Sequence, residues 1–246
     1  MNKYQHKSAL VTGANRGIGR ALVEELLKSG VSRVYAAVRN AATLEELVAQ
    51  SGGRVIPVEI DVTKPETIKQ ATANISNLDI LINNAGVATF KGLVAADSTD
   101  FARAEMEVNY FGTLNMIRAF APALAASGGG TIVNMSSIAG RVNFPVFGSY
   151  CAAKAAVHSL TQGVRAELAA QGTVVVGVYP GPVETDMGAH FPMDCADPVQ
   201  VAQTILADAS AGKEEIFPDV TSQNVHVGLT KDPSGTEKMA GKMLPA

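Results

Sequence analysis

The chain has 246 residues and a formal net charge of −3 at pH 7. Hydrophobic residues make up 47% of the sequence and charged residues 17%, which excludes a disordered chain and is enough for one large α/β domain. The small net charge and the scattered Lys and Arg residues predict neither a nucleic-acid partner nor a membrane partner.

Two cysteines and four histidines occur, but none has the spacing of a metal-ligating pair or of a disulfide framework, so no metal site is predicted. The segment from Met1 to Lys7 is polar, and no apolar leader precedes the first strand. No apolar run reaches the roughly 18 residues that a membrane-spanning helix needs. We therefore expect a cytoplasmic protein.

Short β-branched runs alternate along the chain with longer amphipathic stretches. The predicted strands are Ser8–Thr12, Arg33–Val38, Val55–Ile60, Asp79–Asn83, Thr131–Ser136 and Val174–Tyr179. The predicted helices are one after the first strand that carries Leu22 and Leu26, Ala42–Gln50, one after Pro65, Asp100–Ala125, Tyr150–Ala170 and one from about Pro198. The strands are continuously apolar, as expected for strands that are buried on both faces.

Repeated strand–helix–strand units of this kind predict a doubly wound parallel sheet with helices on both faces, a three-layer Rossmann-like α/β fold in a single domain over residues 1–246. Glu214–Phe217 is a candidate edge strand, and the tail after it turns polar, with a helix start at Asp232-Pro233. The glycine run Ser127–Gly130 suits a loop between a helix and a strand better than a domain boundary.

The first strand leads into Thr12-Gly13-Ala14-Asn15-Arg16-Gly17-Ile18-Gly19, and a helix follows at once. Glycines allow a tight turn and a close approach of the backbone to a pyrophosphate, which the N–H groups of a helix N-terminus bind. The spacing is GxxxGxG, so on its own the loop could also be a simple turn between strand and helix.

The end of the second strand indicates which dinucleotide binds. NAD enzymes carry an acidic residue there for the ribose 2′-hydroxyl, but this strand ends in Val38-Arg39-Asn40. Arg16 in the glycine loop supplies a second guanidinium, and two guanidinium groups suit a 2′-phosphate dianion. NADP(H) is therefore the predicted cofactor, although Arg39 could instead be a solvated surface residue.

Tyr150 and Lys154 are four residues apart, so they share one face of a predicted helix. A nearby ammonium group favours the phenolate and lowers the pKa of a tyrosine, which allows Tyr150 to exchange a proton with a carbonyl/alcohol pair. Ser137 ends the preceding strand, at the edge of the sheet where ligands bind in open α/β folds. Its hydroxyl could bind the substrate oxygen as negative charge develops.

The motifs together resemble those of the short-chain dehydrogenase/reductase superfamily, in its short single-domain, NADPH-preferring branch. The resemblance covers nearly the whole chain. It is carried by Thr12–Gly19, Asp61-Val62, Asn83-Asn84-Ala85-Gly86, Asn109, the set Ser137, Tyr150 and Lys154, and Pro180-Gly181.

The resemblance implies a catalytic set. Tyr150 would exchange the proton, Lys154 would lower its pKa and bind the nicotinamide ribose, and Ser137 would orient the carbonyl. Asn109 would hold a water that links Lys154 to solvent. The cofactor-binding residues implied by the loop, the strand end and the resemblance are Gly13, Asn15, Arg16, Gly17, Ile18, Gly19, Arg39, Asp61, Val62, Asn83, Ala85, Gly86, Tyr150, Lys154, Pro180, Gly181, Val183 and Thr185.

The substrate side is the least defined part of the sequence. The segment 186–197 resembles a truncated lid, from which Met187, His190, Phe191 and Met193 would face Asn143, Phe144 and Phe147 across a pocket. An apolar or aromatic substrate would suit such a pocket. The same residues could equally pack on the protein itself.

The predicted function is NADP(H)-dependent hydride transfer between nicotinamide and a carbonyl/alcohol pair, running towards the alcohol. The alternatives are a non-catalytic NADPH-binding sensor and an epimerase or dehydratase like those of the extended branch of the superfamily. The resemblance also implies a homodimer or homotetramer through the helices 100–125 and 150–170.

Overall fold

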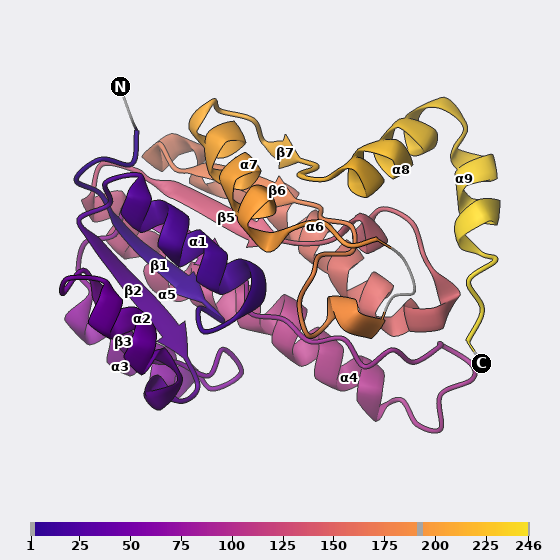
Figure 1. The fold of residues 1–246 in the computed structure, drawn as a ribbon, viewed down its shortest axis with the longest axis horizontal. Coiled ribbons are helices and arrows are strands. Elements are labelled where there is room, and N and C mark those ends of the chain that lie inside the picture. Colours follow the sequence, from indigo (N-terminus) through magenta and orange to yellow (C-terminus); the bar gives the residue numbers. More distant parts are fainter. Residues whose placement is uncertain (1–2, 191–193, 246) are drawn as a thin grey trace.

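The structure, a computed structural model, describes residues 3–190 and 194–245. The strands of these residues form one parallel sheet in the order β3-β2-β1-β4-β5-β6-β7 (Figure 1). They are β1 (Ser8–Thr12), β2 (Arg33–Val38), β3 (Val55–Glu59), β4 (Ile80–Asn83), β5 (Thr131–Met135), β6 (Val174–Val178) and the edge strand β7 (Glu215–Ile216). All seven lie where the sequence predicted strands.

Helices cover both faces of the sheet (Figure 1). Their bounds are α1 (Gly17–Lys28), α2 (Glu45–Gln50), α3 (Pro65–Asn74), α4 (Asp100–Met106), α5 (Gly112–Ala126), α6 (Gly148–Leu168), α7 (Pro198–Ser210), α8 (Val220–Lys231) and α9 (Pro233–Ala240). The apolar sides of α1, α2 and α7 pack on one face, and those of α3, α5 and α6 pack on the other. This arrangement confirms the predicted three-layer, doubly wound fold.

Two hydrophobic cores, one on each face, explain why the strands are continuously apolar. Ala9 and Val11 of β1 belong to the core that contains Leu22 of α1, whereas Leu10 belongs to the opposite core with Phe120 of α5. Neighbouring side chains of a strand point to opposite faces, so each apolar position of β1 has a core to enter. Burying a side chain such as Leu22 contributes about 1.5–3 kcal/mol relative to leaving it in water.

The predicted helix Asp100–Ala125 exists, but it contains a π-helical turn at Glu107–Phe111 between α4 and α5. Such turns hold one residue more than the regular helix and are frequent at functional sites. Asn109, the candidate catalytic residue of this segment, lies within the turn and is buried. The structure thus places the Asn where the helix departs from regular geometry.

The C-terminal region folds into two short helices, α8 and α9, drawn in yellow in Figure 1. The start of α9 at Pro233 was predicted, with Asp232 as its cap, whereas α8 was not. Asp219 caps α8 by accepting a hydrogen bond from the Ser222 N–H, which completes a capping box. The two helices form a hairpin that packs on the turn after β5, because Val225 and Ala240 join Ile138 in one apolar cluster.

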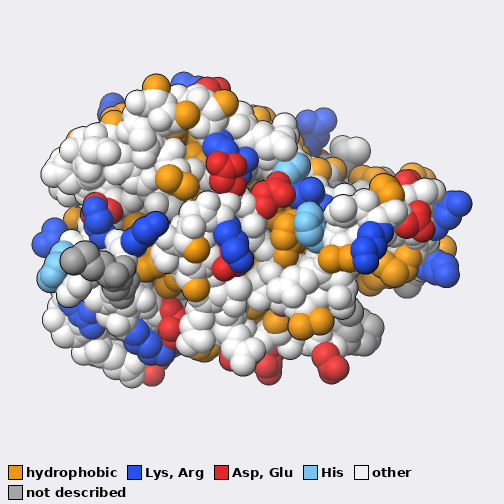
Figure 2. Space-filling view, turned by 90° about the horizontal axis from the view of Figure 1, so that it is seen from above, with side chains coloured by type: hydrophobic (Ala, Val, Ile, Leu, Met, Phe, Trp, Pro, Cys, Tyr) orange, Lys and Arg blue, Asp and Glu red, His pale blue; other side chains and the backbone are white. Residues whose placement is uncertain are grey.

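Lys, Arg, Asp and Glu side chains are interspersed over the face in Figure 2, with hydrophobic side chains between them. This mixture of both signs agrees with the small net charge of −3. In the described part of the chain, no helix is both long enough and apolar enough to cross a membrane.

Candidate active site

A cavity of about 820 Å³ opens at the carboxyl ends of the strands. It extends on both sides of β1 and β4, where the strand order reverses from β3-β2-β1 to β4-β5-β6. Ligands of open α/β sheets bind at such a switch point, because the loops from its two sides part there. One end of the cavity reaches Arg39 and Asp61, and the other end reaches Tyr150 and Met243.

The glycine loop forms the middle of the cavity wall and is held from the β4 side. The Asn84 side chain donates to the carbonyl oxygens of Thr12 and Gly13, at 2.9 and 3.2 Å. Gly13 has a φ of +64°, and a Cβ on Gly19 would collide with the carbonyl oxygen of Gly13. The backbone is therefore bare where the helix α1 begins, and its N–H groups fit a pyrophosphate.

At one end of the cavity, two cations, Arg16 and Arg39, and two carboxylates, Asp61 and Asp186, surround the space beyond β2. Arg16 pairs with Asp186 of the β6–α7 segment at 2.5 Å, and both side chains are largely exposed. Asp61 accepts hydrogen bonds from the backbone and hydroxyl of Thr63. Burial opposes the ionisation of Asp61, but these bonds and the charges of Lys64 and Arg39 outweigh it, so the pKa of Asp61 lies below its usual value.

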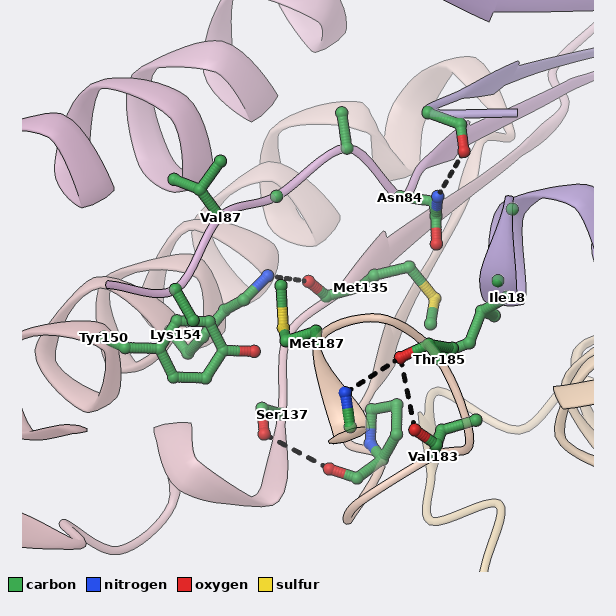
Figure 3. Close-up of a pocket in the computed structure, with 18 of the residues that line it drawn as sticks. Ile18, Asn84, Val87, Met135, Ser137, Tyr150, Lys154, Val183, Thr185 and Met187 are labelled. Atoms are coloured by element: carbon green, nitrogen blue, oxygen red, sulfur yellow. Dashed lines mark hydrogen bonds between the residues drawn. The ribbon is translucent and has the colours of Figure 1, made fainter. Parts of the chain in front are cut away.

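At the other end, Tyr150 and Lys154 of α6 meet Ser137, which follows β5 (Figure 3). The Lys154 ammonium nitrogen donates to the Met135 carbonyl at 2.8 Å and lies 5.6 Å from the centroid of the Tyr150 ring. The Ser137 hydroxyl donates to the Pro180 carbonyl at 3.2 Å. Three proton-handling groups, one from the turn after β5 and two from α6, therefore meet at this end of the cavity.

Burial dominates the acid–base balance of this set. It raises the pKa of Tyr150 above its usual value, while the Ser137 hydroxyl acts in the opposite direction. Burial also lowers the pKa of Lys154 to about 8. The sequence predicted that Lys154 would lower the pKa of Tyr150. The ammonium group binds Met135 and faces the ring of Tyr150, and the lowering of the Tyr150 pKa by Lys154 stays a prediction.

Asn109 lies behind the cavity wall. Its side chain accepts from the Val87 N–H at 3.0 Å and donates to the Val87 carbonyl at 2.9 Å. A Cβ on Gly86 would lie 2.8 Å from Asn109 Oδ1 and 3.3 Å from Lys154 Nζ, so these two groups flank Gly86. Asn109 is therefore close to Lys154, as the resemblance implied, but its amide is engaged by the loop.

Most of the predicted cofactor residues share one wall. Gly13, Asn15, Arg16, Gly17, Ile18, Gly19, Arg39, Asp61, Val62, Ala85, Gly86, Tyr150, Lys154, Pro180, Gly181, Val183 and Thr185 all line the cavity. Asn83 does not. It is buried in the sheet, where its amide donates to the Asn134 side chain at 2.9 Å, and it ties β4 to β5.

The predicted substrate-side residues are only partly together. Phe144, Phe147 and Met187 line the cavity. Asn143 instead donates to the Gly148 carbonyl at 3.3 Å, and His190 stacks on Phe90 with ring centroids 4.4 Å apart. Phe191 and Met193 lie outside the described residues. Asn143 and His190 are not among the residues that line the cavity, so their place on the substrate side stays a prediction.

Sequence reasoning missed two groups of wall residues. The first follows β4 and contains Asn84, Val87, Ala88 and Phe90. The second is the C-terminal hairpin, which contributes Thr221, Val225, Met239, Ala240 and Met243. Asn84 belongs to a recognised motif and could have been found. No local pattern relates the hairpin to Tyr150, because the fold alone brings residues so distant in sequence together.

Comparison with known proteins identifies the family of the chain. The family model described as short chain dehydrogenase matches residues 7–195. A sorbitol dehydrogenase of Cereibacter sphaeroides is 38% identical over 75% of this chain and 72% of its own length. The NADPH-dependent 1-acyldihydroxyacetone phosphate reductase of Saccharomyces cerevisiae is 38% identical over 76% of this chain, which spans 64% of that protein.

Among solved structures, a short-chain dehydrogenase of Burkholderia cenocepacia in complex with NADP has 40% sequence identity and a TM-score of 0.91. That similarity covers 99% of both chains. The chain therefore belongs to the short-chain dehydrogenase family of NAD(P)-dependent oxidoreductases.

Proposed function

We propose that this chain is an NADP(H)-dependent carbonyl reductase or alcohol dehydrogenase. One observation carries the proposal: Tyr150, Lys154 and Ser137 meet at one end of a cavity whose other end holds Arg16 and Arg39. The similar Burkholderia protein binds NADP and the similar yeast protein is NADPH-dependent, which supports the same cofactor here.

NADP(H) would supply the hydride, and the chain would bind the cofactor and position the substrate. The glycine loop and the start of α1 would bind the pyrophosphate. Arg39 and Arg16 would bind the 2′-phosphate, Asp61 and Val62 the adenine, and Val183 and Thr185 the nicotinamide side. We assign all of this to one NADP-binding domain, with the segment 186–197 as a lid.

In the reductive direction, the Ser137 hydroxyl would leave the Pro180 carbonyl and donate to the substrate oxygen. Tyr150 would then transfer its phenolic proton to that oxygen, and the Lys154 charge would stabilise the phenolate that remains. Asn109 would begin the path by which water returns a proton through Lys154.

The wall near Tyr150 supports an apolar or aromatic carbonyl substrate. Phe90, Phe144, Phe147, Met187 and Val225 line it. The charged residues among the described lining, apart from Lys154, are Arg16, Arg39, Asp61 and Asp186, all of which we assign to the cofactor side. A substrate with a second charged group would lose its hydration there without gaining a partner.

The direct test is a titration of the protein with NADPH and NADH, followed by initial rates on aryl ketones, aldehydes and diketones. Tyr150→Phe should lower kcat by about 10²- to 10⁴-fold and change NADPH binding far less, because the proton donor is lost while the ring that lines the cavity is kept. Tyr110→Phe, a half-buried phenol on the π-helical turn, is the matched control. NADPH binding without turnover on any carbonyl compound would favour the non-catalytic sensor.

The cofactor preference has its own test. Arg39→Ala should weaken NADPH binding by about ten-fold or more and leave NADH binding nearly unchanged, because only NADPH carries the 2′-phosphate. Fluorescence titration of both dinucleotides measures this. Equal losses for NADPH and NADH would contradict the assigned role of Arg39.

We also propose self-association through the helices 100–125 and 150–170. Phe111 is 44% exposed at the end of the π-helical turn, and Ala152 and Ala155 are exposed on α6. A small-residue surface with an exposed aromatic ring suits close helix packing. Light scattering that finds only a monomer would contradict this proposal.

A further inference from the structure

The loop that follows β4 crosses the cavity above Tyr150 and Lys154, where Figure 3 labels Val87. Its residues 87–90 form no regular strand or helix. Two side chains of the neighbouring helical segment hold it by the backbone. Asn109 binds both the N–H and the carbonyl of Val87, and Glu105 binds Thr89.

The Glu105 contact is a double one. Its Oε1 accepts from the Thr89 N–H at 2.6 Å and from the Thr89 hydroxyl at 2.8 Å. Glu105 and Asn109 are four residues apart, about 6 Å along a helix, while two residues of extended chain span about 6.6 Å. The spacing of Glu105 and Asn109 along the helix therefore matches the spacing of Thr89 and Val87 along the loop. The helix holds every second residue of the loop, as a neighbouring strand would in a sheet.

The burial of the Glu105 carboxyl group is unusual for a charged residue type. It is fully buried, with 0% exposure, and its second oxygen, Oε2, has no hydrogen-bond partner among the described residues. A buried carboxyl group that is only half satisfied reduces the stability of a fold. Glu105 does not line the cavity, so any role in the reaction acts through the loop it holds.

The residue after Thr89 is Phe90, which adopts a φ of +53° in the left-handed region. Side chains other than glycine are strained there, and such strain persists only where the surroundings enforce it. The two hydrogen bonds from Thr89 to Glu105 enforce it directly next to Phe90. They hold the backbone at the residue directly before the one from which the Phe90 ring leaves it.

Phe90 forms part of the cavity wall on the side that we assign to the substrate. Its ring lies edge-on to Phe147, with centroids 6.3 Å apart, and Phe147 lies edge-on to Tyr150 at 6.1 Å. On its other side, Phe90 stacks on His190 of the β6–α7 segment. A row of rings thus leads from that segment to the proton donor.

We propose that Glu105 is a positioning residue that fixes Phe90, through Thr89, as the specificity-determining wall for carbonyl compounds with a flat ring beside the carbonyl. This inference rests on the proposed function and names its substrate class more narrowly. A fixed row of rings favours a planar ring over a puckered one, because aromatic pairs gain energy from edge-on and offset contacts.

The test compares acetophenone, whose ring is flat and conjugated with the carbonyl group, with cyclohexyl methyl ketone, whose ring is puckered and saturated. Phe90→Ala and Glu105→Ala should each lower the ratio of kcat/KM values, acetophenone over cyclohexyl methyl ketone, by about 3- to 10-fold, mainly through KM. The double variant should show the same ratio as Phe90→Ala alone, because Glu105 acts on the ratio only through the position of Phe90.

Glu105→Gln should restore the ratio, because the amide oxygen still accepts from Thr89. Glu107→Ala, which removes an exposed carboxyl group two residues away, is the matched control. If the role of Glu105 were purely structural, Glu105→Ala would lower thermal stability and change kcat/KM equally for both ketones. That result would overturn the proposal. So would an unchanged ratio in Phe90→Ala.

Binding measurements separate this inference from the proposed activity. Calorimetry with 1-phenylethanol and 1-cyclohexylethanol, in the presence of NADPH, needs no turnover. Suppose that the unaltered protein reduces neither ketone, but that Glu105→Ala weakens the binding of 1-phenylethanol more than the binding of 1-cyclohexylethanol. The positioning role then stands and the proposed reaction fails. Equal weakening of both alcohols, or none, overturns the positioning role itself.

Discussion

Lys154 is the residue whose environment most limits the chemistry of the site. It is 4% exposed, donates to the Met135 carbonyl, and has a pKa lowered by burial to about 8. Tyr150 is shifted the other way by burial, so it remains a neutral phenol at neutral pH. Tyr150 therefore carries the proton that a carbonyl oxygen needs, and the Lys154 ammonium group beside it loses its own proton near pH 8.

The rate of carbonyl reduction should therefore depend on pH through Lys154. As pH rises through about 8, the ammonium group loses the proton that stabilises the Tyr150 phenolate, so kcat/KM should fall. Initial rates between neutral and alkaline pH measure this. Lys154→Met should be slow at every pH and lack this decline, and the same decline in that variant would assign it to another group.

Lys154 also links pH to stability. Its folded pKa lies below the value of about 10.4 for a free lysine, so between these values the unfolded chain binds more protons. The contribution of Lys154 to the free energy of unfolding should rise with pH across this window. Denaturation with urea at several pH values, compared with Lys154→Met, isolates that contribution.

Among the elements, the hairpin of α8 and α9 depends most on a single contact. Asp219 caps α8 through the Ser222 N–H, and its other oxygen accepts from the Gly181 N–H at 2.8 Å. It therefore joins the hairpin to the loop that we assign to the nicotinamide. Asp232 caps α9 through Gly235, but it is exposed.

Asp219→Ala should lower the free energy of unfolding by about 1–3 kcal/mol, since it removes a cap and leaves the Gly181 N–H unpaired. The KM for carbonyl substrates should rise as well, because Thr221 and Val225 of α8 line the cavity. Asp232→Ala, an exposed cap, should cost about 0.5–1 kcal/mol without a change in KM. Equal losses of stability and KM in both variants would contradict this distinction.

Elements could be predicted where local pattern and packing agree. The apolar runs of β1 to β6 and the glycine loop have sequence signals that the structure confirms. α8 lacked such a signal because Asn224, Gly228 and several β-branched residues are poor helix formers, and its cap and its contact with Ile138 stabilise it instead. The π-helical turn likewise has no local signature.

The candidate site divides in the same way. Ser137 and most of the wall that we assign to the cofactor follow from motifs at strand ends, which the parallel sheet brings to one edge. Tyr150 and Lys154 follow from their four-residue spacing on α6. Phe90 and Met239 could not be predicted, because their places depend on the φ of one residue and on how the hairpin docks. The motifs therefore indicate the reaction type, whereas the substrate side requires the structure.

At the scale of the whole molecule, Arg16 and Asp186 bridge the mouth of the cavity. Arg16 follows β1, whereas Asp186 belongs to a segment whose ends are paired through Val183 and Ala196. The bridge connects the two sides of the sheet between which the dinucleotide would bind. It also occupies one of the two guanidinium groups assigned to the 2′-phosphate.

Asp186→Asn should therefore strengthen NADPH binding by about 2- to 5-fold, because exposed ion pairs are worth up to about 1 kcal/mol and the phosphate no longer competes for Arg16. NADH binding should stay unchanged. Titrations at low and high salt should show the gain shrinking as salt rises. A gain for NADH as large as that for NADPH would show that Asp186 does not act through the 2′-phosphate.

The π-helical turn at Glu107–Phe111 makes chain length itself a determinant of the substrate side. Each residue of an α-helix advances the helical phase by about 100°, so removing one residue from the turn would rotate α4 against α5 by that angle. The face of α5 that carries Phe120 would stay in the core, but Glu105 would turn away from Thr89. A variant of this chain that lacks one residue of the turn should therefore lose the contact that we propose positions Phe90, even with every other residue unchanged.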